Sequence, residues 1–278
     1  MPGTCAITGV SGFAGNALAR RFQAAGWHVI ALTRSMNNIP SSIETRPFVL
    51  GGLVPPSLLK GADILVHAAY DFSLTRWADI CHVNAVGSEY LFDAAARAGV
   101  KRQIFISSMS AFEGCRSHYG RSKLAAENAV QIRGGIAVRP GMIYGEKNGG
   151  IAAQIIRIAK KWPVIPMIDR GDFPFYSCHV DDLCAAILHL ANADEIAGNL
   201  YIAANPAPVS LIGLAKSASM GKPKLIFSVP WSWMFAALWL AERIGLRPPF
   251  RSDSVFSLVH RNPDPDFRLA VPVNFRPY

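Results

Sequence analysis

The feature that most constrains the fold is a glycine-rich turn near the start of the chain, between an apolar segment and an amphipathic one. Residues 4–8 are short and apolar, as in a buried strand, and residues 14–25 have the spacing of a helix that ends before Gly26. Gly9, Gly12 and Gly15 follow the strand at three-residue intervals. The first glycine permits a tight turn, the second lets the backbone approach a pyrophosphate, and the third allows close helix–strand packing. Because a helix N-terminus attracts anions, we predict a dinucleotide phosphate site here.

The rest of the first half alternates between short apolar segments and helical segments. Strands are predicted at residues 4–8, 27–32, 46–50, 63–68, 103–107 and 136–139, and helices at residues 14–25, 77–98 and 119–132. Repeated strand–helix–strand units predict an α/β protein with a Rossmann-type, doubly wound parallel sheet. Beyond residue 145 helices are predicted at residues 151–161, 181–191 and 211–220, among proline-rich connections. We expect residues 1–145 to form the nucleotide-binding domain, and residues 146–278 to form mostly a smaller C-terminal substrate lobe, with some later segments returning to the first domain.

The segment after the second predicted strand selects the cofactor. A carboxylate there would bind the ribose 2′-hydroxyl of NAD, whereas an arginine accommodates the 2′-phosphate of NADP. Residues 31–35 read Ala-Leu-Thr-Arg-Ser and contain no acid. Arg34 therefore favours NADP, and NAD is the alternative if Arg34 is an ordinary surface residue.

A tyrosine and a lysine four residues apart are candidate catalytic groups. Tyr119 and Lys123 open a predicted helix, and their spacing places both side chains on one face. A free tyrosine has a pKa of about 10, and a nearby ammonium group favours the phenolate, so we expect Lys123 to lower the pKa of Tyr119. The third member should be a hydroxyl at the end of the fifth strand. Ser108 is preferred over Ser110 because strand ends fix geometry better than loops do.

These motifs resemble the extended short-chain dehydrogenase/reductase family, also called NAD-dependent epimerase/dehydratase-like. Similar segments occur at residues 63–69, at Asn84, at residues 139–145 and at residues 179–183, so the resemblance covers roughly residues 3–200. It implies a Rossmann fold, Ser108, Tyr119 and Lys123 as the catalytic residues, and hydride exchange at a hydroxyl or ketone carbon. The cofactor-binding residues that it implies are Gly9, Ser11, Gly12, Phe13, Gly15, Arg34, His67, Ala68, Ala69, Ser107, Tyr119, Lys123, Pro140, Gly141 and Ile143.

Three segments depart from the family pattern. Residues 51–53 read Gly-Gly-Leu where members often have Gly-Asp-Leu, so the aspartate contact to adenine is missing. Residues 109–111 read Met-Ser-Ala where dehydratases have Asp-Glu, which argues against dehydration. Residues 173–178 lack the Arg-Asp pair that precedes the His-Val-Asp-Asp segment, which weakens a nucleotide-sugar assignment. We expect Asp181 or Asp182 to cap a helix, and we expect no metal site because three converging ligands are not evident.

The last part of the chain is basic and rich in tryptophan. Residues 216–278 contain nine basic and four acidic residues, and the arginines flank a segment holding Trp231, Trp233 and Trp239. Arginine on phosphate and aromatic side chain on base would suit a nucleotide diphosphate. The same segment could instead be an apolar lid, a helix on a membrane surface, or a packed helix with solvated arginines. We therefore expect a nucleotide-sugar reductase or epimerase; the alternatives are a dehydrogenase of a sterol- or lipid-like alcohol, or a non-catalytic NADP-binding module.

Composition excludes two further classes. The net charge is +9, yet only 17% of residues are charged and 51% are hydrophobic, so the chain is not intrinsically disordered. The positive charges are scattered, which argues against nucleic-acid binding. Few cysteines, no basic signal segment before residue 8 and no apolar run of about 18 residues predict a cytoplasmic protein. A homodimer through residues 77–98 and 119–132 is the expectation from the family.

Overall fold

The centre of the protein is a seven-stranded, all-parallel sheet. The computed structural model describes residues 2–35, 39–145, 164–218, 225–246, 248 and 250–278. The sheet order is β11-β6-β5-β4-β1-β2-β3. Its strands are β1 (Thr4–Thr8), β2 (His28–Thr33), β3 (Glu44–Pro47), β4 (Ile64–His67), β5 (Arg102–Ile106), β6 (Ile136–Pro140) and β11 (Leu200–Ala203). The predicted Rossmann-type α/β fold is confirmed, and the order reverses at β1, which is where such sheets bind ligands.

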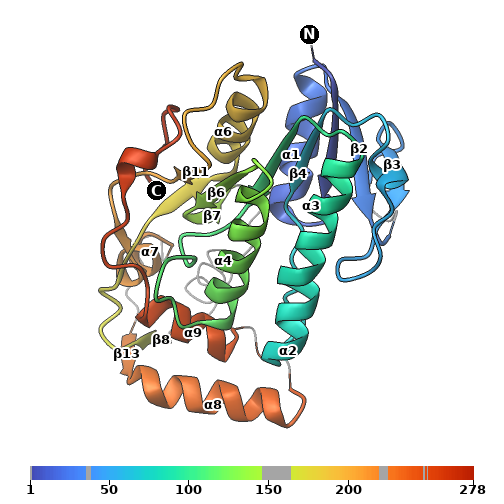
Figure 1. Ribbon diagram of the computed structural model, residues 1–278. Helices are drawn as coiled ribbons and strands as arrows, with labels where there is room; N and C mark the ends of the chain where they lie inside the picture. Colours follow the sequence, from blue (N-terminus) through green and yellow to red (C-terminus); the bar gives the residue numbers. More distant parts are fainter. Residues whose placement is uncertain (1, 36–38, 146–163, 219–224, 247, 249) are drawn as a thin grey trace.

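Helices cover both faces of this sheet (Figure 1). Successive residues of a strand point to opposite faces, so Cys5 and Ile7 of β1 pack with α1 (Phe13–Ala24) and α6 (Val180–Asn192). Ala6 packs instead toward α3 (Gly87–Arg97) and α4 (His118–Gln131). Each face therefore has its own apolar core, and the two cores fix the sheet from both sides.

The long helix predicted at residues 77–98 has three parts. It begins as α2 (Trp77–Ile80), widens into a π-helical turn, η2 (Cys81–Val86), and continues as α3. Asn84 lies in the wide turn; its side chain accepts a hydrogen bond from the Asp71 backbone N–H at 2.7 Å and donates to the Asp71 carbonyl at 3.3 Å. The wide turn thereby holds the loop that follows β4.

Two differences from the sequence-based elements concern the sheet. Strand β3 begins at Glu44, earlier than predicted, because it pairs with β2 from Ile30 onward. Strand β11 was not predicted at all: it is four residues long, and its pairing with β6 joins segments about 60 residues apart. The helix predicted at residues 151–161 lies outside the described residues.

The remaining elements form a smaller layer beside the carboxyl ends of the strands. It contains the paired strands β7 (Met142–Tyr144) with β10 (Ser177–His179), β8 (Val164–Ile168) with β13 (Leu225–Val229), and β9 (Pro174–Phe175) with β12 (Val209–Ser210). Its helices are α7 (Leu211–Ala218), α8 (Trp231–Arg243) and α9 (Ser252–Val259). Two short 3-10 helices lie elsewhere in the described chain: η1 (Pro56–Leu59) after β3 and η3 (Phe267–Leu269) near the C-terminus. Helix α8 lies at the edge farthest from the N-terminus, with α9 between it and α4 (Figure 1). No helix among the described residues has both the length and the apolar character needed to cross a bilayer.

The start of α6 differs from the prediction. His179, rather than an aspartate, precedes the helix and accepts the Asp181 N–H through Nδ1 at 3.2 Å. Asp182 instead accepts hydrogen bonds from the Arg276 backbone N–H and from its Nε, both at 2.8 Å. The buried Asp182 carboxylate thus links the end of the chain to α6, and the His179 imidazole caps the helix.

Candidate active site

The glycine-rich turn has the geometry that a dinucleotide phosphate site requires. Gly9 has φ +73°, and a Cβ there would lie 2.9 Å from the Ala68 backbone. A Cβ on Gly15 would overlap the Gly9 carbonyl, so both glycines are needed for close packing. Gly12 and Ser11 are exposed, Phe13 is half-buried, and no side chain in the described part of the chain caps the start of α1. The first turn of α1 is therefore open to an anion, and these residues fit the phosphates of a dinucleotide.

A buried histidine fixes the strand end beside this turn. Thr8 Oγ1 accepts the Ala68 and Ala69 backbone N–H groups, both at 3.0 Å, so its own proton goes to His67 Nδ1 at 2.7 Å. His67 then donates from Nε2 to Ser88 at 2.8 Å. Burial, with a contribution from the Lys123 charge, lowers the pKa of His67 to about 3. His67 is therefore a neutral support, and its side chain is not exposed to a ligand.

Arg34 lies just after the carboxyl end of β2, the strand next to β1. It is exposed one residue beyond β2, which pairs with β1 in parallel register. The charge of Arg34 also affects Asp71, whose pKa is lowered overall. Burial alone would raise this pKa, but hydrogen bonds from Ser73 and the charges of Arg34 and Arg251 together outweigh the burial. The end of β2 therefore offers a cation, as the sequence predicted, at the edge of the sheet that carries the glycine-rich turn.

Tyr119 and Lys123 lie in the first turns of α4. Lys123 is buried; its Nζ donates to the Ile106 carbonyl at 2.7 Å and lies 4.6 Å from the centre of the Phe105 ring. Burial lowers the pKa of Lys123 to about 7, although the charge of Glu127 acts in the opposite direction. Burial also raises the pKa of Tyr119, while a hydrogen bond with Ser108 opposes the rise. The expectation that Lys123 lowers the pKa of Tyr119 was wrong, because burial is the largest cause and raises this pKa, and the group that opposes the rise is Ser108.

The structure separates the two candidate serines. Ser108 interacts with Tyr119 through its side chain and accepts the Ser110 N–H at 3.1 Å. Ser110 instead shares a hydrogen bond at 3.1 Å with Ser257 of α9. Ser107 is buried, and its hydroxyl has no partner among the described residues. Ser108 is therefore the hydroxyl that the fold brings to Tyr119.

The segment after β6 runs alongside these serines. The Ser107 N–H donates to the Val138 carbonyl at 2.7 Å, and the Met109 N–H donates to the Pro140 carbonyl at 3.1 Å. Gly141 packs so closely that a Cβ would lie 2.5 Å from the Tyr176 carbonyl oxygen. Ile143 follows in β7 and packs against the core beside α1 and α6. Pro140 and Gly141 are thus held beside the candidate catalytic serine.

Two aromatic residues beside Tyr119 were not predicted. The Tyr70 ring lies edge-on to the Tyr119 ring at 5.0 Å, and the Phe72 ring stacks on it at 5.8 Å. The Tyr70 hydroxyl hydrogen-bonds with Ser122 at 3.0 Å. Both rings follow the carboxyl end of β4, and that position was the available signal, since parallel sheets bind ligands at that edge. They form an apolar wall next to the candidate catalytic hydroxyl.

Helix α9 fixes the start of α4. The Asp253 carboxylate accepts the His118 N–H at 2.8 Å and the Tyr119 N–H at 2.9 Å. Ser117, the residue before the helix, accepts the Gly120 N–H at 3.0 Å. The three N–H groups of the first turn are thereby satisfied, two of them by a side chain from the C-terminal part of the chain.

Comparison with known proteins places this geometry in a family. The sequence pattern of the NAD dependent epimerase/dehydratase family matches residues 5–203, about seven-tenths of the chain. The chain belongs to that family. The match includes the glycine-rich turn and the residues around Tyr119, so the resemblance inferred from the motifs is confirmed.

Individual family relatives differ in what their names say they act on. Ceramide reductase of Caulobacter vibrioides is 31% identical over 194 residues, which cover 67% of this chain and 60% of that protein. The 4-hydroxy-2-methyl-3-oxo-4-farnesyl-3,4-dihydroquinoline-1-oxide ketoreductase of Stigmatella aurantiaca is 28% identical over 237 residues, 74% of this chain and 69% of that protein. UDP-glucose 4-epimerase of Thermotoga maritima, solved with UDP-glucose, has a TM-score of 0.71 at 17% identity and covers 92% of this chain and 96% of that chain. The structural likeness to the epimerase shows the shared fold.

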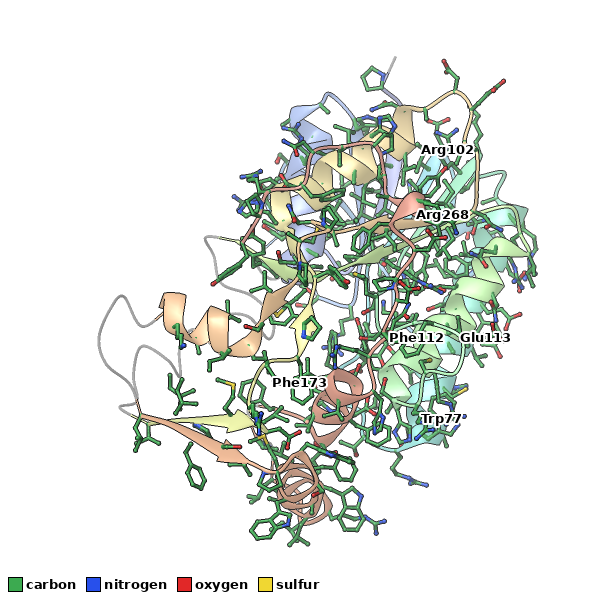
Figure 2. The ribbon with its side chains drawn as sticks, turned by 90° about the vertical axis from the view of Figure 1, so that its left-hand side faces the viewer. Trp77, Arg102, Phe112, Glu113, Phe173 and Arg268 are labelled. Atoms are coloured by element: carbon green, nitrogen blue, oxygen red, sulfur yellow. The ribbon has the colours of Figure 1, made fainter. Side chains whose placement is uncertain are left out.

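The arginines of the C-terminal part have partners within the protein. These contacts join Arg243 to the Trp239 ring, Arg251 to the Phe72 carbonyl, Arg261 to the Phe173 ring, Arg268 to Asp266, and Arg276 to Asp182. In Figure 2, Arg268 is labelled nearer to Arg102, the first residue of β5, than to Trp77. Arg247 lies outside the described residues. No group of three or more potential metal ligands occurs in the part of the chain that the structure describes.

Proposed function

We propose that this protein is an NAD(P)-dependent oxidoreductase that interconverts a ketone and a secondary alcohol on an apolar, lipid-like substrate. The observation that carries the proposal is the arrangement at the start of α4, where Ser108 interacts with Tyr119 and Lys123 lies one helical turn away. The glycine-rich turn of the same sheet edge supports the dinucleotide part of the proposal. When bound, the dinucleotide supplies or accepts the hydride.

Each residue has a distinct role in this proposal. Ser108 and Tyr119 hydrogen-bond the substrate oxygen, and Tyr119 donates a proton to a ketone oxygen or removes one from an alcohol. Lys123 gives one N–H to the Ile106 carbonyl, which leaves further donors for a ribose hydroxyl. With its pKa raised by burial, Tyr119 starts as the neutral phenol, which is the form that can give a proton to a ketone oxygen.

Three observations favour an apolar substrate over the nucleotide sugar preferred from sequence. Tyr70 and Phe72 place two aromatic rings against the ring of Tyr119. Each described C-terminal arginine already contacts a carboxylate, a carbonyl or an aromatic ring within the protein. The names of the ceramide reductase and the farnesyl-quinoline ketoreductase describe apolar substrates. An apolar alcohol, the alternative from sequence, therefore fits the surroundings of Tyr119 better.

A reductase assay with paired substrates tests this proposal. Purified protein with NADPH or NADH is given a long-chain keto lipid or a steroid ketone, and in parallel a UDP-hexose or UDP-4-keto-hexose. We expect cofactor oxidation with an apolar ketone, lost in Tyr119→Phe but kept in Tyr90→Phe, a tyrosine exposed on α3. Turnover of the UDP-sugar alone would refute the substrate class, and full activity of Tyr119→Phe would refute the role of the hydroxyl.

The cofactor preference has its own test. We propose NADP as the cofactor, because Arg34 is exposed at the end of β2 with no acid beside it in residues 31–35. Arg34→Asp should weaken NADPH binding and strengthen NADH binding, and Arg20→Asp on the exposed side of α1 serves as the charge-matched control. The two affinities are measured by fluorescence titration. If their ratio is unchanged in Arg34→Asp, Arg34 does not select the cofactor.

A further inference from the structure

Helix α8 is apolar on two opposite faces. On its inner face the Trp231 and Phe235 rings contact the Phe256 ring of α9, at 6.3 and 5.8 Å between centroids. Its outer face is also apolar. Trp233 and Leu240 are 73% and 57% exposed, and Ile244, the first residue after the helix, is 68% exposed. No residue of α8 is buried. A helix on the surface of a globular protein normally turns a polar face to water, so the outer face of α8 lacks its usual partner.

The spacing shows that these exposed side chains share one stripe. Trp233, Ala236, Ala237, Leu240 and Ile244 are separated by three or four residues and are all exposed. The strand that leads into α8 has the same character, since Leu225 and Phe227 of β13 are exposed. The exposed apolar side chains of α8 thus form a row along one element rather than single scattered residues.

Of the two charged residues of α8, only the basic one is exposed. Glu242 turns inward and accepts hydrogen bonds from the Ser252 N–H and hydroxyl, at 2.9 and 2.7 Å. Asp253 likewise faces α4. Arg243 is exposed at the end of the stripe, with its guanidinium 4.6 Å from the centre of the Trp239 ring. The exposed charge on α8 is therefore positive.

We propose that the outer face of α8 lies on an anionic lipid bilayer, in the plane of its surface. Tryptophan is favoured at the boundary between headgroups and acyl chains, and an apolar helix face with flanking arginine is the pattern of an interfacial helix. The helix has 13 residues, fewer than the roughly 20 that span a bilayer. Arg243 at the end of the stripe adds attraction to anionic headgroups.

The charge pattern favours lipid over a second copy of the chain. If two α8 helices packed against each other through this stripe, Arg243 would lie beside apolar side chains, because the stripe carries no acidic residue. On an anionic bilayer the guanidinium reaches the phosphates, and its aliphatic part and the Trp239 ring cover the apolar layer. Since α8 packs on α9, which holds the start of α4, docking would bring the catalytic helix close to the lipid.

Vesicle binding by the full chain tests the proposal. Flotation is measured with vesicles of phosphatidylcholine alone and of phosphatidylcholine mixed with phosphatidylglycerol, at low and high salt. We expect binding to the anionic vesicles, weakened by salt and reduced at least about tenfold in Trp233→Glu and in Leu240→Glu. Leu53→Glu is the matched control, because Leu53 is 97% exposed on the loop after β3 and should not alter binding.

Each other outcome overturns the proposal. Absence of wild-type binding, or equal loss in Leu53→Glu, would exclude α8 as a lipid-binding helix. Light scattering that shows a dimer abolished by Trp233→Glu, without vesicle binding, would assign the stripe to self-association. The substituted residues are exposed, so the variants should fold, which circular dichroism verifies. Vesicle binding does not depend on the proposed reaction, so the two proposals can fail separately.

Discussion

Substitution of Asp253 should separate the contribution of the C-terminal part of the chain from that of the catalytic groups. Its carboxylate receives the His118 and Tyr119 N–H groups at 2.8 and 2.9 Å, and no other side chain among the described residues is seen to accept them. In Asp253→Ala both donors at the start of α4 lose their acceptor. The residue is half-buried, so water replaces part of what is lost.

The size of the effect follows from the two bonds. A hydrogen bond to a charged group contributes about 1.5–3 kcal/mol, and loss of a single helix cap costs about 0.5–2 kcal/mol. Partial replacement by water places the loss for Asp253→Ala at about 2–3 kcal/mol of unfolding free energy. Asp253→Asn keeps one acceptor oxygen and should lose about half as much. Ser117→Ala, which removes only the Gly120 bond, should lose about 1 kcal/mol.

Urea unfolding and steady-state kinetics measure the two consequences. Since the Tyr119 backbone is no longer held, kcat in Asp253→Ala should fall by about tenfold, as expected when a reacting group is misplaced. Dinucleotide affinity should fall much less than kcat, because the glycine-rich turn that would hold the phosphates lies on β1 and α1, apart from the start of α4. Asp266→Ala is the control: among the described residues, the side chain of this partly exposed aspartate accepts hydrogen bonds from the backbone N–H and guanidinium of Arg268, two residues along the chain. If Asp253→Ala resembled Asp266→Ala in both stability and kcat, the inferred hold of α9 on the catalytic helix would be refuted.

Two further predictions concern buried groups. Glu127 is buried and forms two hydrogen bonds with Arg139, at 2.8 and 2.6 Å, so Glu127→Gln should cost about 3–5 kcal/mol in urea unfolding. The same substitution removes a charge that raises the pKa of Lys123, so if Lys123 controls the pH dependence of the rate, the apparent pKa in that profile should fall below about 7. An unchanged apparent pKa would show that Lys123 does not control the profile. His67 has a pKa of about 3 when folded, against an ordinary value of about 6.5, so the unfolded chain binds an extra proton between these values. This contribution to stability is complete above pH 6.5 and falls by about 1.4 kcal/mol per pH unit as the pH drops toward 3. His67→Gln should remove that slope from unfolding free energies measured at several pH values, and a parallel pH dependence in both proteins would show that His67 does not titrate on unfolding.

Much of the fold could be predicted because its signals are local. The glycine-rich turn lies within one strand–turn–helix unit, and six of the seven sheet strands appear as short apolar segments. The spacing of Tyr119 and Lys123 fixes their common helix face whatever surrounds them. Strand β11 was not predicted because four residues are too few to show a hydrophobic periodicity, and its partner β6 is distant in the chain.

The candidate site was predicted in part, for the same reason. Tyr119, Lys123 and Ser108 were found by motif, whereas Tyr70 and Phe72 carry no motif and matter only because β4 ends beside α4. Sequence spacing also suggested that Lys123 would lower the pKa of Tyr119. Burial decides the direction instead, and burial is not visible in the order of residues.

The sequence by itself determined the family, the parallel sheet, the phosphate-binding turn and the pair of side chains on α4, since each depends on residues close together in the chain. Only the tertiary structure decided where the net positive charge of the C-terminal part goes. Arg276 binds Asp182, Arg251 binds the Phe72 carbonyl, and Asp253 binds the start of α4, across separations of 94 to 179 residues. Such contacts form because folding brings distant backbone and charged groups together, where each buried donor needs an acceptor. The stripe on α8 became apparent in the same way, because exposure depends on what packs against a helix, and no spacing within the helix can show that.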